Sequence, residues 1–198
     1  MKKNLILWGP IGCGKSTMIK EALGEDAILA GGYVTLRAKF ENQLIGFDLA
    51  PAAVLCSRQD LRRIERFLEF GETKVQRPEV FEGLGTILLK EAIKKDFSVL
   101  DEFGGLELLV PSFREELQNL LCSPVPCIGV LKTREASKSM TQRLGMNTAY
   151  EDAYEEMLKF LQEDSGTEIL STSGWKDFAA REKILAWVRQ YVRKTKDV

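Results

Sequence analysis

The amino-acid sequence predicts an α/β protein with a mostly parallel central sheet flanked by helices. Strand-like apolar runs alternate with helix-like amphipathic segments along its 198 residues, which is typical of repeated β-α-β units. A glycine-rich segment at 9–16 joins the first apolar run to the first helix-like segment. A later apolar run at 97–100 ends in two adjacent acids. Because parallel strands joined by helices end at one edge of a sheet, we expect these two features to lie together.

The N-terminal part of the chain is predicted to form a strand, a helix and a β-hairpin. The apolar run at 5–8 indicates the strand, and the segment 16–23, which Gly24 ends, indicates the helix. Two strand-like runs follow at 33–37 and 44–49, and the polar residues between them favour a hairpin turn. The predicted fold therefore carries a β-hairpin after its first helix.

The sequence predicts the structure of two short segments after the hairpin less clearly. Residues 53–56 fit a further short strand, whereas residues 60–70 mix apolar and charged side chains, with three apolar ones on one helical face. Arginines make this stretch basic and suit contact with the phosphates of a ligand or acceptor. A solvated face balanced by neighbouring glutamates is the simpler interpretation. The basic residues are Arg58, Arg62, Arg63 and Arg66.

Helices and strands continue to alternate in the second half of the chain. An amphipathic helix is predicted at 79–95, and Ser112 with Glu115 indicates a capping box at the start of the next helix. Buried strands are predicted at 126–131 and 167–173. A last helix carries apolar side chains that we interpret as core packing, namely Trp175, Phe178, Ile184, Leu185, Val188 and Val192.

The segment 9–16 matches the pattern G-x-x-x-x-G-K-S/T of a phosphate-binding loop, or P-loop, in its required place between strand and helix. Its glycines let the backbone approach a phosphate closely, and amides at the helix start replace the water around the anion. Lys15 is expected to reach the β- and γ-phosphates, and Ser16 to place its hydroxyl on Mg²⁺. The predicted nucleotide-binding residues are Gly9, Pro10, Ile11, Gly12, Cys13, Gly14, Lys15, Ser16 and Thr17.

The two acids that follow the 97–100 run are candidates for the metal and the base. Asp101 fits the Walker B aspartate, which holds Mg²⁺ through water. Glu102 is expected to polarise an attacking water as general base, so Lys15 and Glu102 are candidate catalytic residues. A buried strand ending in a solvated acidic turn is the alternative, and the P-loop upstream argues against it.

Composition excludes several other chemistries. The chain has no histidine, which rules out Ser-His-Asp and Cys-His catalysis and histidine-ligated metals. Four cysteines without a C-x-x-C pair indicate reduced thiols in the cytoplasm. A net charge of −1 gives no general attraction to nucleic acid or anionic membranes, and no apolar run approaches a membrane span. The expected ligand is a nucleoside triphosphate with Mg²⁺.

Residues 1–198 are predicted to form one domain. Within it, the sequence pattern of 132–165 indicates the structure least clearly. Basic residues there precede an acidic helix-like stretch at 151–164. One interpretation is a lid that closes over the triphosphate and supplies an arginine, with Arg143 as the candidate catalytic cation. A solvated helical insertion is the other interpretation.

The order of segments resembles the small P-loop nucleoside-triphosphatases first described in thermophiles and related to the human cancer-related nucleoside-triphosphatase. The resemblance rests on the P-loop and on the segments 31–37, 45–48, 80–89 and 99–108. It implies Mg²⁺-dependent hydrolysis of ATP, GTP and other triphosphates. Phosphate binding would fall to 9–17, and the metal and water to Asp101 and Glu102. The chain departs from the family at Gly105, where a lysine-type residue is usual, and in its longer connection at 132–165.

Three functions stay open on the sequence alone. A nucleoside-triphosphatase is favoured, because Glu102 beside Asp101 suits activation of water. A kinase for a nucleotide or other small molecule would use the same site, with 58–66 and 132–165 holding the acceptor. A nucleotide-dependent switch or adaptor would bind a protein partner and use hydrolysis as a timer. The absence of an N-K-x-D guanine motif weakens a GTPase switch.

Overall fold

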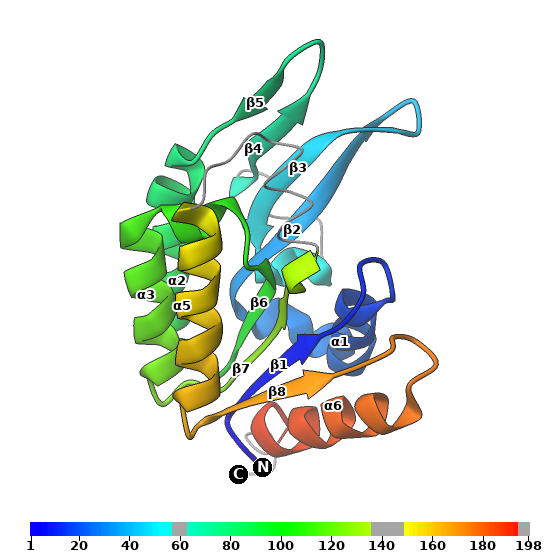
Figure 1. Ribbon diagram of the computed structural model, residues 1–198. Coiled ribbons are helices and arrows are strands. Elements are labelled where there is room, and N and C mark those ends of the chain that lie inside the picture. Colours follow the sequence, from blue (N-terminus) through cyan, green and yellow to red (C-terminus); the bar gives the residue numbers. More distant parts are fainter. Residues whose placement is uncertain (57–62, 136–148, 194–198) are drawn as a thin grey trace.

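The computed structural model describes residues 1–56, 63–135 and 149–193, which build one continuous sheet with helices on both faces (Figure 1). In these residues eight strands pair in the order β5-β4-β3-β2-β6-β7-β1-β8. The strands are β1 (Asn4–Trp8), β2 (Gly31–Phe40), β3 (Gln43–Pro51), β4 (Glu65–Phe70), β5 (Lys74–Gln76), β6 (Ser98–Phe103), β7 (Cys127–Leu131) and β8 (Thr167–Ser171). The α/β class with a mostly parallel sheet is confirmed.

Five neighbouring strands run parallel and bring their carboxyl ends to one edge. Strand β1 pairs in parallel with β7 and β8, and β6 pairs in parallel with β7 and β2. Strands β3, β4 and β5 extend the sheet beyond β2 through antiparallel pairing. The predicted hairpin is the β2–β3 pair, which turns at Glu41 and Asn42 with φ angles of 47° and 66°. Positive φ angles at both positions suit a tight hairpin turn.

The longer helices cover the two faces of the sheet in separate groups (Figure 1). Helices α2 (Thr86–Ala92), α3 (Pro111–Cys122) and α5 (Ala149–Glu163) lie on one face, and α1 (Lys15–Leu23) and α6 (Phe178–Tyr191) on the other. Alternate side chains of β1 serve the two cores, with Ile6 packed toward α2, α3 and α5, and Leu5 and Leu7 toward α1 and α6. The other short helices of the described residues are the 3₁₀ helices η1 (Gly24–Leu29), η2 (Ala52–Leu55) and η5 (Leu106–Leu109), and the π-helix η4 (Phe81–Gly85), which runs directly into α2.

Two segments that follow the hairpin differ from the sequence predictions. The short strand predicted at 53–56 is wrong, because Ala52–Leu55 forms a 3₁₀ turn that buries Ala52 in the α1–α6 core. Residues 65–70 form strand β4, which pairs with β3, although the apolar spacing over 60–70 also fits a helix. A register shift between Phe47 and Asp48 in this pair explains the irregular alternation.

Helix α3 begins without the predicted capping box. Pro111 occupies the first turn, Val110 is the residue before the helix, and no side chain caps the helix start. Proline is favoured here because its fixed φ suits a helix and its missing N–H leaves no donor unsatisfied. Ser112 therefore lies inside the helix rather than before it.

The apolar pattern near the C-terminus belongs to the core only in part. Ile184, Val188 and the unpredicted Trp187 are fully buried under the sheet. Phe178 is 74% exposed and Trp175 is 38% exposed, so interpreting these two as core residues is wrong. The cause is the helix start, because Asp177 caps α6 by accepting a 3.0 Å hydrogen bond from the amide of Ala180.

The acidic helix predicted within 132–165 is α5, which packs firmly against the sheet. It buries Tyr150, Tyr154, Met157 and Leu161. Residues 136–148, which include Arg143, lie outside the described residues, as do Arg58 and Arg62. In the described parts of the chain, the helices fall short of the length and apolar character that crossing a membrane requires.

Candidate active site

The P-loop joins β1 to α1 at the carboxyl edge of the sheet. Gly12 and Gly14 have φ angles of 72° and 98°, a region that side chains with a Cβ rarely adopt. Gly14 stands immediately before α1, and its carbonyl accepts a 2.9 Å hydrogen bond from the amide of Met18. The loop therefore presents its backbone at the positive end of a helix, an arrangement suited to binding an anion.

Lys15 bends back over the loop and is 8% exposed. Its ammonium donates hydrogen bonds of 2.7 Å to the carbonyl oxygens of Gly9 and Pro10. These carbonyls hold the positive charge on the inner side of the loop. A phosphate bound there would meet both the charge and the helix amides.

The predicted metal residues Ser16, at the start of α1, and Asp101, in β6, meet at the carboxyl edge of the sheet. The Ser16 hydroxyl donates a 2.6 Å hydrogen bond to Oδ1 of Asp101, which is 7% exposed. Burial raises the pKa of Asp101 to about 7, and the nearby Glu102 acts in the same direction. The hydrogen bond from Ser16 and the charges of Lys132 and Lys15 lower this pKa and offset part of the rise.

A β-bulge separates the two acids. The pairing of β6 with β7 shifts register between Leu100 and Phe103, so β6 holds one extra residue there. Glu102 lies in this bulge with a φ of 58°, a left-handed conformation uncommon for a non-glycine residue. Leu100 and Phe103 consequently both face the α2–α3–α5 core, while Asp101 reaches Ser16 on the other side. The extra residue thus lets Phe103, in place of Glu102, occupy the next core-facing position after Leu100.

Glu107 fixes the turn that follows these acids, a role that the sequence analysis missed. Its Oε1 accepts 2.6 Å hydrogen bonds from the amides of both Gly104 and Gly105. The hydroxyl of Tyr150, in the first turn of α5, donates a 2.5 Å bond to the carbonyl of Gly104. An acid three residues after a glycine is the signal that could have indicated this turn.

Lys132 is a second cation at the site that the sequence analysis did not single out. It follows β7, where its amide donates to Phe103 at 2.9 Å and its carbonyl accepts from Tyr154 at 2.7 Å. Its ammonium lies 2.6 Å from where a Cβ on Gly105 would be, and its charge acts on Asp101. Among the described residues the ammonium makes neither a hydrogen bond nor an ion pair. The sequence signal for this cation is a lysine directly after a parallel strand that ends at the carboxyl edge of the sheet.

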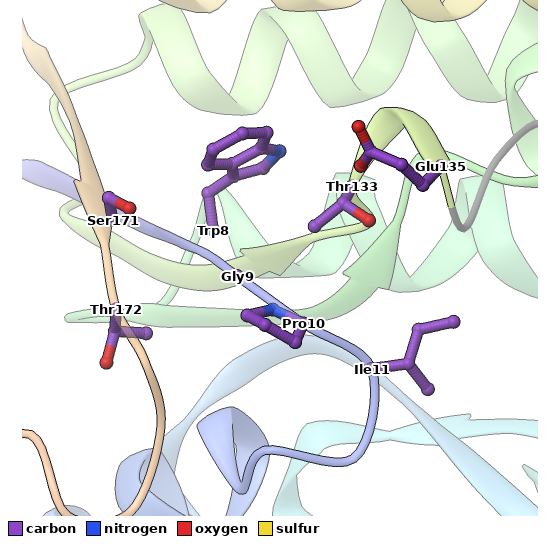
Figure 2. Close-up of a pocket in the computed structure, with 8 residues that line it drawn as sticks. All are labelled: Trp8, Gly9, Pro10, Ile11, Thr133, Glu135, Ser171 and Thr172. Atoms are coloured by element: carbon purple, nitrogen blue, oxygen red, sulfur yellow. The ribbon is translucent and has the colours of Figure 1, made fainter.

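A cavity of about 510 Å³ opens beside the first half of the P-loop (Figure 2). Figure 2 shows its walls at the ends of three adjacent strands, β7, β1 and β8. The lining residues are Trp8, Gly9, Pro10, Ile11, Thr133, Glu135, Ser171 and Thr172.

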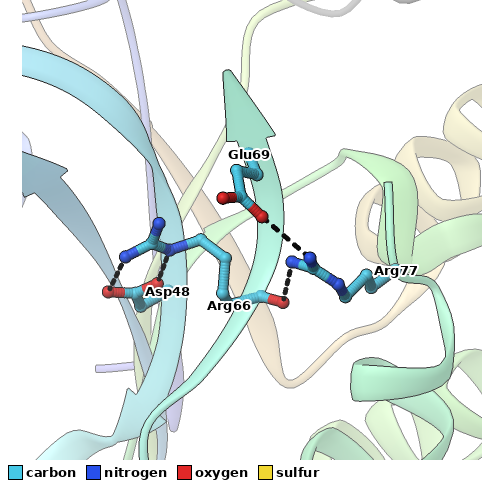
Figure 3. A network of polar contacts seen from close by, with 4 residues as sticks. All are labelled: Asp48, Arg66, Glu69 and Arg77. Atoms are coloured by element: carbon cyan, nitrogen blue, oxygen red, sulfur yellow. Dashed lines mark hydrogen bonds and ion pairs between the residues drawn. The ribbon is translucent and has the colours of Figure 1, made fainter. Parts of the chain in front are cut away.

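The described arginines of the basic segment are engaged elsewhere. Arg66 forms an ion pair with Asp48, and Arg77 links Glu69 to the carbonyl of Arg66 at 2.8 and 3.4 Å (Figure 3). Arg63 pairs with Glu91 at 2.8 Å, a different partner from the neighbouring glutamates expected. The Arg66 pair ties β3 to β4, and the Arg63 pair ties the segment just before β4 to helix α2. These contacts favour the structural interpretation over phosphate contact.

A glycine loop between a strand and a helix, with a serine hydroxyl bonded to the acid of a parallel strand, defines the P-loop class of nucleotide-binding proteins. Within that class, a family model described as NTPase matches residues 4–152, well over half of the chain. The protein therefore belongs to this NTPase family and is an enzyme of that kind.

A curated relative and two solved structures are similar to this chain. Nucleoside-triphosphatase THEP1 from Thermotoga sp. (strain RQ2) is 29% identical over 132 residues, which cover 65% of this chain and 73% of that protein. The crystal structure of THEP1 from the hyperthermophile Aquifex aeolicus has a TM-score of 0.58 at 17% identity, covering 96% and 98% of the two chains. The solution structure of a human cancer-related nucleoside triphosphatase has a TM-score of 0.59 at 16% identity, covering 94% and 96%. At these identities the two structures bear on the fold alone.

Proposed function

We propose that this NTPase hydrolyses the γ-phosphate of ATP, GTP and other nucleoside triphosphates in a Mg²⁺-dependent reaction. The observation that carries the proposal is the 2.6 Å contact between Ser16 and Asp101 beside the helix end of the P-loop. It joins the groups that a phosphate and its cation need, one from the start of α1 and one from β6, which are distant in sequence. We place the reaction in the cytoplasm, in keeping with free thiols at all four cysteines.

Mg²⁺ suits the residues present at this point. The Ser16 hydroxyl and the Asp101 carboxylate are oxygen donors, which this small hard cation prefers, and it commonly keeps several waters beside one or two protein groups. Ser16 and Asp101 would hold the ion together with phosphate oxygens. When bound, it supplies neutralisation of the charge that develops on the transferred phosphoryl group.

The protein's own groups divide the remaining work. The loop amides bind the phosphates, and the Lys15 ammonium exchanges the carbonyls of Gly9 and Pro10 for phosphate oxygens. Glu102 orients a water and accepts its proton as the water attacks the γ-phosphorus. Lys132, which has its ammonium near Asp101, adds positive charge on the γ-phosphate side.

The cavity beside the P-loop favours a second candidate, transfer of the γ-phosphate to a small acceptor. About 510 Å³ next to Gly9, Pro10 and Ile11 is enough space for a small molecule. An acceptor bound there would compete with water. If the protein is a kinase, a suitable acceptor will raise ADP release and become phosphorylated, whereas a hydrolase will release inorganic phosphate at an unchanged rate.

The direct test is phosphate release from ATP, GTP, CTP and UTP, each with Mg²⁺ and with a chelator. We expect release that requires Mg²⁺, with none detectable for Lys15→Ala and a slow rate with retained nucleotide binding for Glu102→Gln. Lys20→Ala and Glu21→Gln are matched controls, because both residues are exposed on α1. Wild-type rates in Lys15→Ala, or the absence of release from all four nucleotides, would overturn the proposal.

A further inference from the structure

The loop between β8 and α6 is fastened directly to the P-loop. The amide of Thr172 donates to the carbonyl of Trp8 at 2.9 Å, and the amide of Trp175 donates to the carbonyl of Cys13 at 2.8 Å. A Cβ on Gly174 would lie 2.3 Å from the Cys13 carbonyl oxygen, so the two backbones pack too closely for a side chain. The position of Trp175 is consequently fixed by the P-loop itself.

Trp175 is held in place without being buried. A Cβ on Gly14 would contact the Trp175 Cβ at 3.5 Å, and the Arg181 guanidinium lies 4.4 Å from the centre of the indole ring. This cation–π contact orients the ring. The side chain nevertheless stays 38% exposed, beside the last glycine of a phosphate-binding loop. A large aromatic ring that is rigidly supported and open to solvent suits a flat ligand.

The layout of the sheet sets the direction in which a nucleotide lies. Asp101 and Glu102 are on β6, which is separated from β1 by β7, whereas Trp175 follows β8 on the opposite side of β1 (Figure 1). The γ-phosphate belongs on the side of the acids, because the lysine and the metal act on the β- and γ-phosphates. The α-phosphate and nucleoside then extend toward the β8–α6 loop, where the indole of Trp175 lies.

We propose that Trp175 is the stacking surface for the nucleobase of the bound nucleotide. The inference rests on the proposed function, and it adds a subsite for a purine or pyrimidine ring beside the phosphate site. Stacking tolerates every base because each presents a π face, so this subsite binds all four common nucleotides. Purines bind more tightly than pyrimidines, because the larger ring covers more of the indole.

The test compares two ligands that share a diphosphate and differ in the nucleoside. Calorimetry with Mg²⁺ measures the Kd of ADP and of inorganic pyrophosphate for the wild type and for Trp175→Leu, which keeps an apolar contact with Gly14. Loss of base stacking is expected to weaken ADP about tenfold and to leave pyrophosphate unchanged. Trp175→Phe is expected to retain most of the ADP affinity, and Phe178→Ala, a nearby exposed aromatic, to retain all of it.

The outcomes separate this subsite from other roles of Trp175. Equal weakening of ADP and pyrophosphate would mean that the ring only supports the loop, and unchanged ADP binding would mean that the base lies elsewhere. Either result overturns the inference. Both ligands lack a γ-phosphate, so the binding result does not depend on hydrolysis. Failure of phosphate release with intact ADP binding would count against the proposed reaction alone.

Discussion

The hydroxyl of Ser16 lies 2.6 Å from a carboxylate oxygen of Asp101, although the two residues are 85 positions apart. Strand β7 pairs with both β1 and β6 and so aligns their carboxyl ends. A single hydrogen bond therefore connects the helix after β1 to the end of β6. The environment that permits it also makes Asp101 hard to ionise.

Asp101 gives the protein a pH-dependent stability. Its folded-state pKa is about 7, well above the value near 3.9 of an unfolded aspartate. The folded state therefore binds the proton more tightly, and this stabilisation is complete below pH ~4 and is lost as pH rises through ~7. Urea titrations with chelator measure the free energy of unfolding of Asp101→Asn and of the wild type at pH 5 and pH 8. The value for the variant relative to the wild type should rise by a few kcal/mol from pH 5 to pH 8. The same difference in unfolding free energy between the two proteins at both pH values would contradict the argument that burial raises the pKa of Asp101.

Replacing Glu102 with glycine should make the protein more stable and abolish its activity. Glycine adopts the φ of 58° without strain, and relief of that strain is worth about 1 kcal/mol. Glu102→Gly should therefore unfold at a higher denaturant concentration than the wild type and fail to hydrolyse nucleotides. Glu102→Gln is the matched control, since it loses the base but keeps the strained conformation. Equal midpoints for these two variants would show that the bulge imposes no strain.

Removal of Glu107 should destabilise the turn after β6. Two amides, of Gly104 and Gly105, lose their shared acceptor in Glu107→Ala and are left in a buried position. A loss of about 3 kcal/mol in unfolding free energy is expected, with a smaller loss for Glu107→Gln, which retains an oxygen. Glu115→Ala, at an exposed position on α3, should leave stability unchanged. If the Glu107 and Glu115 variants behave alike, the two hydrogen bonds do not support the fold.

Lys132 should affect the rate more than the fold. Its ammonium is bonded to no other described group, so Lys132→Met removes a charge without leaving a partner exposed. We expect kcat to fall about tenfold with an unchanged thermal midpoint, and Lys132→Arg to recover part of the rate. Steady-state kinetics with a Mg²⁺ nucleotide give both values. Wild-type kcat in the methionine variant would remove Lys132 from the reaction.

Predictions from sequence succeeded where the chain specifies structure locally or through strand order. The P-loop is specified by eight consecutive residues, 9–16, and its conformation depends on its own glycines. The meeting of Ser16 with Asp101 follows from a general rule, because parallel strands share their carboxyl edge. Both could therefore be predicted without coordinates.

The missed features depend on geometry that residue spacing does not encode. The bulge at Glu102 is set by the pairing of β6 with β7, and glutamate gives no local sign of a positive φ. Trp175 continues the apolar spacing of α6, but the cap at Asp177 places it outside the helix. Lys132 and Gly105 approach each other only because β6 and β7 end side by side. The role of Arg143 stays a prediction.

The bond from Tyr150 to Gly104 joins α5 to the chain just beyond Glu102. The first turn of that helix is thus part of the support beneath the proposed base, while its later turns pack against the sheet. A disturbance at the start of α5 would consequently reach the proposed reaction centre without passing through the P-loop. On the proposed mechanism, changes on the β8–α6 side should therefore alter nucleotide affinity, and changes at the start of α5 should alter turnover.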